Sequence, residues 1–131
     1  MKCPCHSGKE YTDCCGPYHN HEESCPNARA LMRSRYSGFA LEKAEYIMET
    51  THPENPAVQA DKKKWGEQIL AFSKATEFKG LEILDFQEKE DWATVTFKAI
   101  LLQGTEDQSF TEKSTFYKVD GKWLYHSGQF L

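Results

Sequence analysis

The first fifteen residues constrain this chain more than any other segment, because they hold four cysteines. Cys3-Pro4-Cys5 and the adjacent pair Cys14-Cys15 are separated by eight residues. A segment this short cannot bury an apolar core, but four thiolates can hold a zinc ion tetrahedrally and leave no coordination position open. Metal binding would then supply the free energy that folds the segment. The spacing therefore predicts a structural zinc site.

The predicted zinc ligands are Cys3, Cys5, Cys14 and Cys15. One alternative stays open, in which His19 is the fourth ligand and Cys15 is free. Redox chemistry is disfavoured because no Cys-x-x-Cys precedes a helix. Cys25 lies beyond a polar stretch, so we expect it to take no part in the site.

Composition limits the remaining possibilities. The 131 residues are 39% hydrophobic, which supports one domain with a real core and a small appendage. No apolar run reaches about 18 residues and no apolar signal segment opens the chain, so we expect a cytoplasmic protein with no membrane partner. That compartment keeps thiols reduced, which favours metal binding over disulfides. The net charge of −4 argues against nucleic-acid binding.

Three segments follow one another along the chain. Residues 1–19 form the cysteine segment, residues 20–27 read as a polar linker, and residues 28–131 form the main domain. Apolar residues at spacings of three and four predict three helices at the start of that domain. They are expected over 28–36 with a break at Ser37-Gly38, from 39 to a stop at Thr51-His52-Pro53, and from Asn55-Pro56 to about 72.

The hydrophobic period changes to two after Gly80, which indicates strands. Residues 93–101 alternate most clearly, with a strand before them near 81–83 and another over 110–119. Asp120-Gly121 is typical of a tight hairpin turn, and residues 123–127 form the returning strand. Helices first and strands after predict an α+β fold, with three helices packed on one face of a curved antiparallel sheet.

Two stretches resemble known families. Residues 3–15 resemble the SEC-C motif, a zinc knuckle also found at the C-terminus of the SecA translocation ATPase. The bacterial YchJ family is similar over Leu31–Phe39, Tyr46, Thr51-His52-Pro53, Trp123-Leu124-Tyr125 and Gly128. This resemblance implies a SEC-C knuckle joined to a cone-shaped α+β domain similar to nuclear transport factor two. Many family members carry a second cysteine knuckle at the C-terminus, and the present sequence ends at Leu131 without one.

A cone-shaped domain of this kind encloses a pocket between its helices and the concave face of its sheet. The predicted ligand-binding residues are Tyr36, His52, Trp65 and Trp123. Core packing is the favoured explanation for each of the aromatic residues, and His52 before Pro53 most simply ends a helix. Arg33 and Arg35 are two positions apart on a helix, so one can enter the pocket while the other faces away.

These features favour a binding or adaptor module over an enzyme. In SecA the similar knuckle is associated with the chaperone SecB and with ribosomes, so the resemblance implies a protein partner for the knuckle. The cone would hold a small ligand or form a homodimer. A zinc ion with four thiolate ligands cannot activate water, and the sequence contains no recognisable pairing of a nucleophile with a base. The alternative is a small enzyme, similar to isomerases or dehydratases, that uses the cone pocket.

Overall fold

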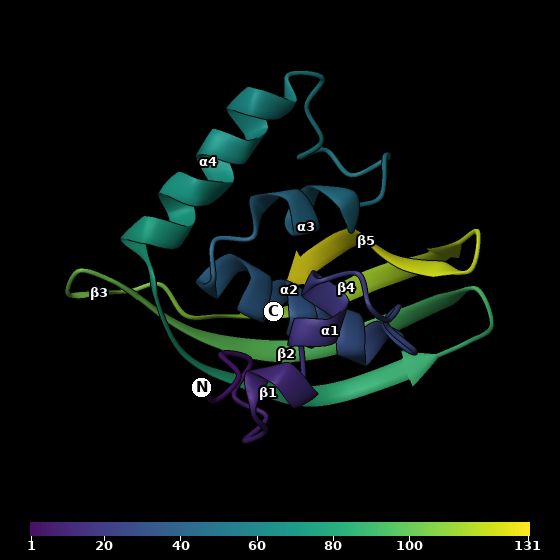
Figure 1. Ribbon diagram of the computed structural model, residues 1–131, viewed down its shortest axis with the longest axis horizontal. Helices are drawn as coiled ribbons and strands as arrows, with labels where there is room; N and C mark the ends of the chain where they lie inside the picture. Colours follow the sequence, from purple (N-terminus) through teal and green to yellow (C-terminus); the bar gives the residue numbers. More distant parts are fainter.

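The sheet is built by the alternation of apolar and polar residues in the second half of the chain. In the computed structural model, which describes residues 1–131, four long strands pair antiparallel in the order β1-β2-β4-β5 (Figure 1). Their bounds are Glu77–Glu88 (β1), Trp92–Gln103 (β2), Phe110–Val119 (β4) and Lys122–Phe130 (β5). A short strand β3, Glu106–Asp107, pairs with the end of β2. The predicted meander is confirmed.

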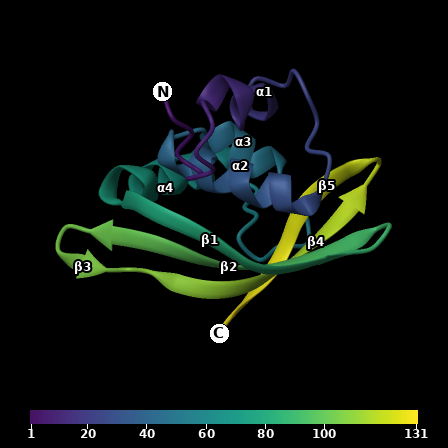
Figure 2. The ribbon, with the colours of Figure 1, turned by 90° about the horizontal axis from the view of Figure 1, so that it is seen from below.

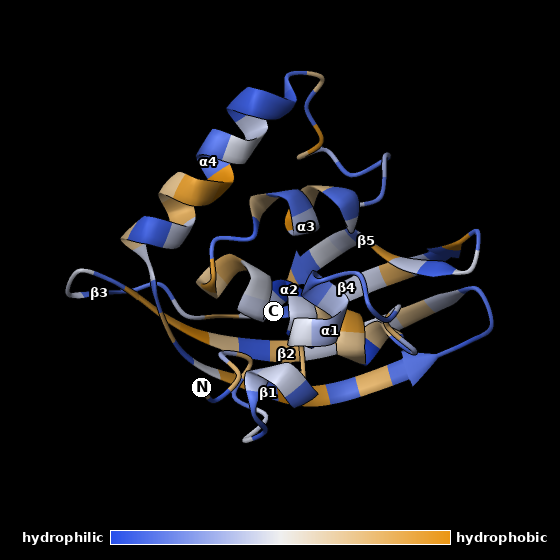
Figure 3. Ribbon diagram, viewed as in Figure 1, coloured by the Kyte–Doolittle hydropathy of each residue, from blue (hydrophilic) through white to orange (hydrophobic).

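One face of the sheet carries the core. Along β2, Ala93, Val95, Phe97, Ala99 and Leu101 are buried, and the residues between them are more exposed, as the alternation predicted. Figure 3 shows the same alternation as hydrophobic and hydrophilic bands along the strands. The buried face belongs to a cluster of twelve apolar residues that also includes side chains from the first long helix.

Helices cover this inner face and leave the outer face of the sheet open (Figure 2). They are α2 (Ala28–Ala40), α3 (Ala44–Glu49) and α4 (Lys62–Ala75). The side chain of Asn27 caps α2 by accepting a hydrogen bond from the backbone of Ala30 at 2.7 Å. None of the helices is both long and apolar enough to cross a lipid bilayer.

Two predicted helix boundaries were wrong. Helix α2 continues through Ser37-Gly38, where the glycine permits close packing: a Cβ on Gly38 would lie 3.2 Å from Cδ1 of Ile47. The helix expected at Asn55-Pro56 begins at Lys62 instead. Asn55 forms a turn by accepting a hydrogen bond from the backbone of Ala57, and Asp61 is the residue that caps α4.

The cysteine segment folds into a 3₁₀ turn, Tyr11–Asp13, and a one-turn helix α1, Gly16–His19. It lies on the side of α2 that faces away from the sheet (Figure 2). Nη1 of Arg33 donates a hydrogen bond to the carbonyl of Cys5 at 3.1 Å, and the ring of His6 donates to the carbonyl of Phe78 at 3.1 Å. The segment is therefore docked on the helix layer by polar contacts.

Candidate metal centre and cone cavity

The four predicted cysteine ligands lie together. The sulfur atoms of Cys3, Cys5, Cys14 and Cys15 are all within 4.8 Å of one another. Cys5 and Cys14 are 3.6 Å apart, and Cys14 and Cys15 are 3.9 Å apart. A tetrahedral zinc ion with sulfur ligands at about 2.3 Å separates those sulfurs by about 3.8 Å. The donor set and its spacing therefore fit a bound metal ion.

Polar neighbours favour negative charge on this cluster. The hydroxyl of Ser7 lies 3.2 Å from the sulfur of Cys14, and Nη1 of Arg33 lies 3.8 Å from the sulfur of Cys5. A hydrogen bond from the thiol of Cys15 lowers the pKa of Cys5 to about 4, and the same bond raises the pKa of Cys15. The thiols alone thus favour one thiolate, and a metal cation would stabilise the others as thiolates.

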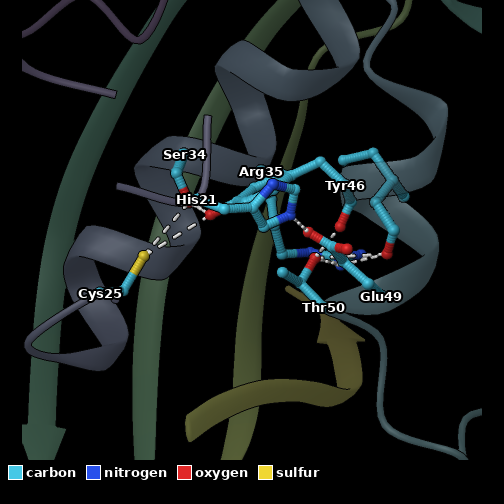
Figure 4. Close-up of polar contacts among 8 residues, drawn as sticks. His21, Cys25, Ser34, Arg35, Tyr46, Glu49 and Thr50 are labelled. Carbon is cyan, nitrogen blue, oxygen red and sulfur yellow. Dashed lines mark hydrogen bonds and ion pairs between the residues drawn. The ribbon is translucent and has the colours of Figure 1, made fainter. Parts of the chain in front are cut away.

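His19 is occupied elsewhere. Its Nε2 donates a hydrogen bond to the carbonyl of Ser34 at 2.8 Å, and its Nδ1 accepts one from the hydroxyl of Tyr11 at 2.6 Å. Both ring nitrogens are used, and burial lowers the pKa of the imidazole. Cys25 lies apart from the cluster, with its sulfur 3.6 Å from the hydroxyls of Ser34 and Tyr46 (Figure 4).

A cavity of about 230 Å³ lies between the helices and the inner face of the sheet. Its walls are mostly apolar and come from α2, α4 and strands β1, β2, β4 and β5. The polar residues that line it are Arg35, Glu112, Ser114 and Tyr125. These four give an otherwise hydrophobic cavity one polar region.

The carboxylate of Glu112 is the centre of this polar region. Glu112 is only 9% exposed. Its Oε2 accepts hydrogen bonds from the hydroxyls of Ser114 and Tyr125, the second at 3.1 Å, whereas Oε1 has no hydrogen-bond partner in the protein. Gly128 on β5 lies against this carboxylate, and any Cβ there would collide with it. A buried carboxylate with one free oxygen is an acceptor for a ligand.

Arg35 lines the same cavity and is held in place by contacts of its own. Its Nη1 donates to the hydroxyl of Thr50 at 2.8 Å (Figure 4). The same nitrogen donates to the carbonyl of Ile47 and the hydroxyl of Thr51, each at 3.0 Å. Its guanidinium carbon lies 4.8 Å from the ring centroid of Tyr125. Burial lowers the pKa of Arg35 to about 10, so the side chain stays charged near neutral pH.

The predicted pocket residues do not all meet. Tyr36 lines the cavity, donates to the carbonyl of Gly80 at 2.8 Å, and has its pKa raised by burial to about 12. Trp65 packs with Ile47 and Ile69 in a separate cluster, and Trp123 is buried in the main core. His52 lies outside the cavity, beside β5.

The sequence reading missed Glu112, Ser114 and Tyr125. A signal for the first two was present: Glu112, Ser114 and Phe116 alternate along β4, so two polar residues share the inward face with a core phenylalanine. The two arginines separate as their spacing predicted, because Arg35 lines the cavity and Arg33 contacts the cysteine segment.

Comparison with known proteins decides the family. Residues 27–128 match the family described as "YchJ, middle NTF2-like domain". The chain belongs to the YchJ family. A curated YchJ-family relative, the UPF0225 protein SCO1677 of Streptomyces coelicolor, is 36% identical over 98% of this chain and 95% of its own length.

Solved structures agree with this assignment. A SEC-C motif containing protein from Rhodopseudomonas palustris is similar to this YchJ-family chain with a TM-score of 0.85 and 37% identity, covering 100% of this chain and 99% of its own. A second SEC-C motif containing protein, from Psychrobacter arcticus, has a TM-score of 0.80 and 31% identity, covering 95% of this chain and 80% of its own. The knuckle and the cone are thus both features of related proteins.

Proposed function

We propose that this protein is a zinc-stabilised binding module whose cone cavity holds a small ligand. The observation that carries the proposal is Oε1 of Glu112, which has no hydrogen-bond partner and belongs to a largely buried residue that lines an apolar cavity. A ligand that donates a hydrogen bond to this oxygen would gain about 0.5–1.5 kcal/mol net. The cavity residues that would contact the ligand are Tyr36, Arg35, Glu112 and Tyr125.

The chemistry of the cavity selects the class of ligand. Apolar walls favour a compact hydrophobic body, and the carboxylate of Glu112 favours an O–H or N–H group at one end. The hydroxyls of Ser114 and Tyr125 already donate to that carboxylate, so they offer a ligand little further donation. Arg35 is also charged, but its Nη1 already donates to Ile47, Thr50 and Thr51. Glu112 therefore sets the preference in the part of the cavity that it lines, where small amines and alcohols are favoured and ionised carboxylic acids are repelled.

The cysteine cluster has a structural role in this proposal. Zinc bound by Cys3, Cys5, Cys14 and Cys15 would be closed to water and would fold residues 1–19. The knuckle would then present a rigid surface to a protein partner. A polar groove of about 650 Å³ between the knuckle and β1 supports this role, with Lys9, Arg29 and Arg33 along it.

A ligand screen by NMR tests the cavity. The probes are small aromatic and aliphatic amines, alcohols and carboxylic acids. We expect amines and alcohols to shift the NMR signals of Tyr36 and Tyr125. The substitution Glu112→Gln should lower the affinity for amines at least about tenfold. Glu106→Gln is the matched control, because Glu106 is exposed on β3 and far from the cavity lining. The proposal fails if no probe binds, or if both variants bind alike.

A small enzyme is the second candidate, and Glu112 is the observation that favours it. A carboxylate in a mostly apolar cavity beside the phenol of Tyr125 can act as a general base. No histidine lines this cavity, so the acid–base work would depend on Glu112 and Tyr125. Turnover of a bound probe that disappears with Glu112→Gln would favour the enzyme over the binding module.

A further inference from the structure

Three metal-binding side chains meet outside the cone, where the loop after α3 crosses β5. The ligand atoms of His52, Glu54 and His126 all lie within 4.8 Å of one another. Nε2 of His126 is 3.2 Å from Oε1 of Glu54, and Nδ1 of His52 is 4.0 Å from the same oxygen. Two imidazoles thus face one carboxylate, and the three residues come from two separate segments of the chain.

The backbone holds these two segments together. The backbone N–H of His52 donates to the carbonyl of Tyr125 at 2.8 Å, and Nδ2 of Asn55 donates to the carbonyl of His126 at 2.7 Å. The ring of Tyr117 packs edge-on against both imidazoles, whose ring centroids are 5.0 Å apart. The ligand set is therefore positioned before any ion binds, which reduces the entropy lost on binding.

The hydrogen bond of the His126 ring is compatible with coordination, and that of the His52 ring would have to break. Nδ1 of His126 lies 2.9 Å from the hydroxyl oxygen of Ser127, which can accept a hydrogen bond from the ring N–H. In that tautomer the lone pair of Nε2 faces Glu54. Nδ1 of His52 accepts the backbone N–H of Glu54 at 3.0 Å. A metal ion at His52 would compete with that single hydrogen bond, so the affinity should be moderate.

We propose that His52, Glu54 and His126 form a second divalent-metal site, distinct from the cysteine cluster. Two imidazoles and one carboxylate suit zinc, and three protein ligands leave a coordination position for water or another ligand. The exposed pair His21 and Glu49, with Nε2 and Oε1 2.5 Å apart, contains only two donors and serves as the internal comparison. The third donor is what turns an ordinary ion pair into a metal site.

Calorimetric titration of zinc into the full chain, with the cysteine cluster already saturated, tests this site. We expect one further zinc per chain, bound at least about tenfold more weakly after Glu54→Gln or His126→Gln. Glu54 is largely exposed, so Glu54→Gln cannot act by unfolding the protein. His21→Gln is the matched control and should leave the second site unchanged.

Three outcomes would overturn the proposal. They are the absence of a second binding event at millimolar zinc, retention of full affinity in Glu54→Gln and His126→Gln, and an equal loss in His21→Gln. Ring signals in NMR spectra provide a second readout, because zinc should shift those of His52 and His126 together and leave His21 unaffected.

Discussion

The cysteine segment and the cone differ in what fills their interiors. The cone buries a cluster of twelve apolar residues from α2 and the sheet, whereas the buried cluster of the cysteine segment contains three side chains, all of them cysteines. Burial of apolar surface, at about 25 cal/mol per Å², is sufficient to fold the larger region. The smaller region buries few apolar side chains, so we propose that its order depends on a metal ion bound by its sulfur atoms.

The two regions still share a boundary. His19 is buried against α2, and Arg33 reaches from α2 to the backbone of Cys5. These contacts are hydrogen bonds, each with a net contribution of about 0.5–1.5 kcal/mol. We therefore expect the cysteine segment and the cone to be weakly coupled, so that a substitution in one has a small effect on the stability of the other.

Truncation of the cone core should have the largest effect. Phe116 is 1% exposed, so Phe116→Ala should lower the free energy of unfolding by about 3–5 kcal/mol, measured by urea denaturation. Phe130→Ala, at a strongly exposed position, should change it by less than about 0.5 kcal/mol. Loss of zinc from folded Phe116→Ala protein would contradict the separation of the two units.

Removal of one sulfur ligand should affect the cysteine segment strongly and the cone only slightly. Cys14→Ser should lose the bound zinc and disorder residues 1–19, while the cone still unfolds cooperatively. The cone should lose about 1–3 kcal/mol, the value of two hydrogen bonds at the boundary. Elemental analysis and urea denaturation measure both effects. Cys25→Ser is the control and should keep its zinc, and a fully metallated Cys14→Ser would rule out the proposed ligand set.

The boundary should respond to pH through His19. Burial lowers the pKa of His19 in the folded protein below its ordinary value of about 6.5. The unfolded chain therefore binds more protons as the pH falls below about 6.5, so the stability linked to neutral His19 is complete above that value and is lost below it. His19→Gln should reduce the slope of stability against pH between 5 and 7. An unchanged slope would show that His19 does not titrate in this range.

The helix cap next to the linker should give the smallest effect. Asn27→Ala removes the hydrogen bond to the backbone of Ala30 and should cost about 1 kcal/mol of cone stability. Thermal denaturation measures this cost, and zinc content should not change. Asn27→Asp restores a capping oxygen and should recover most of the loss. A drop in zinc content in Asn27→Ala would indicate that the cap serves the knuckle.

The strands were predictable because their signal is local. Alternation along residues 93–101 and the Asp120-Gly121 turn placed the meander without knowledge of its partners. The break expected at Ser37-Gly38 was wrong because tertiary packing decides it, since α3 lies against Gly38. Local preferences for helix or turn cannot show which neighbour will pack against a residue.

The cysteine cluster could likewise be predicted from local spacing, whereas the polar region of the cavity could not. The cysteines lie within thirteen positions, so their spacing alone predicted that they would meet. The polar region of the cavity joins Arg35 in α2 to Glu112 in β4 and Tyr125 in β5, and no spacing along the chain links these residues. His52 was predicted to line the cavity as one of the polar and aromatic residues available to it, but the loop after α3 places it beside β5, next to His126.

The residue at the position of Gly128 indicates, in a related sequence, whether the cavity can hold a carboxylate as Glu112 does here. A methyl group at this position would meet the end of the Glu112 side chain, so the carboxylate can keep its place only while Gly128, which lies diagonally across from Glu112 and directly opposite Ser114, is glycine. In any set of aligned relatives, the two columns should therefore vary as a pair. Sequences with a larger residue at the second column should either lack the acid at the first or hold its carboxylate in another position, and their cavities should accept a different class of molecule.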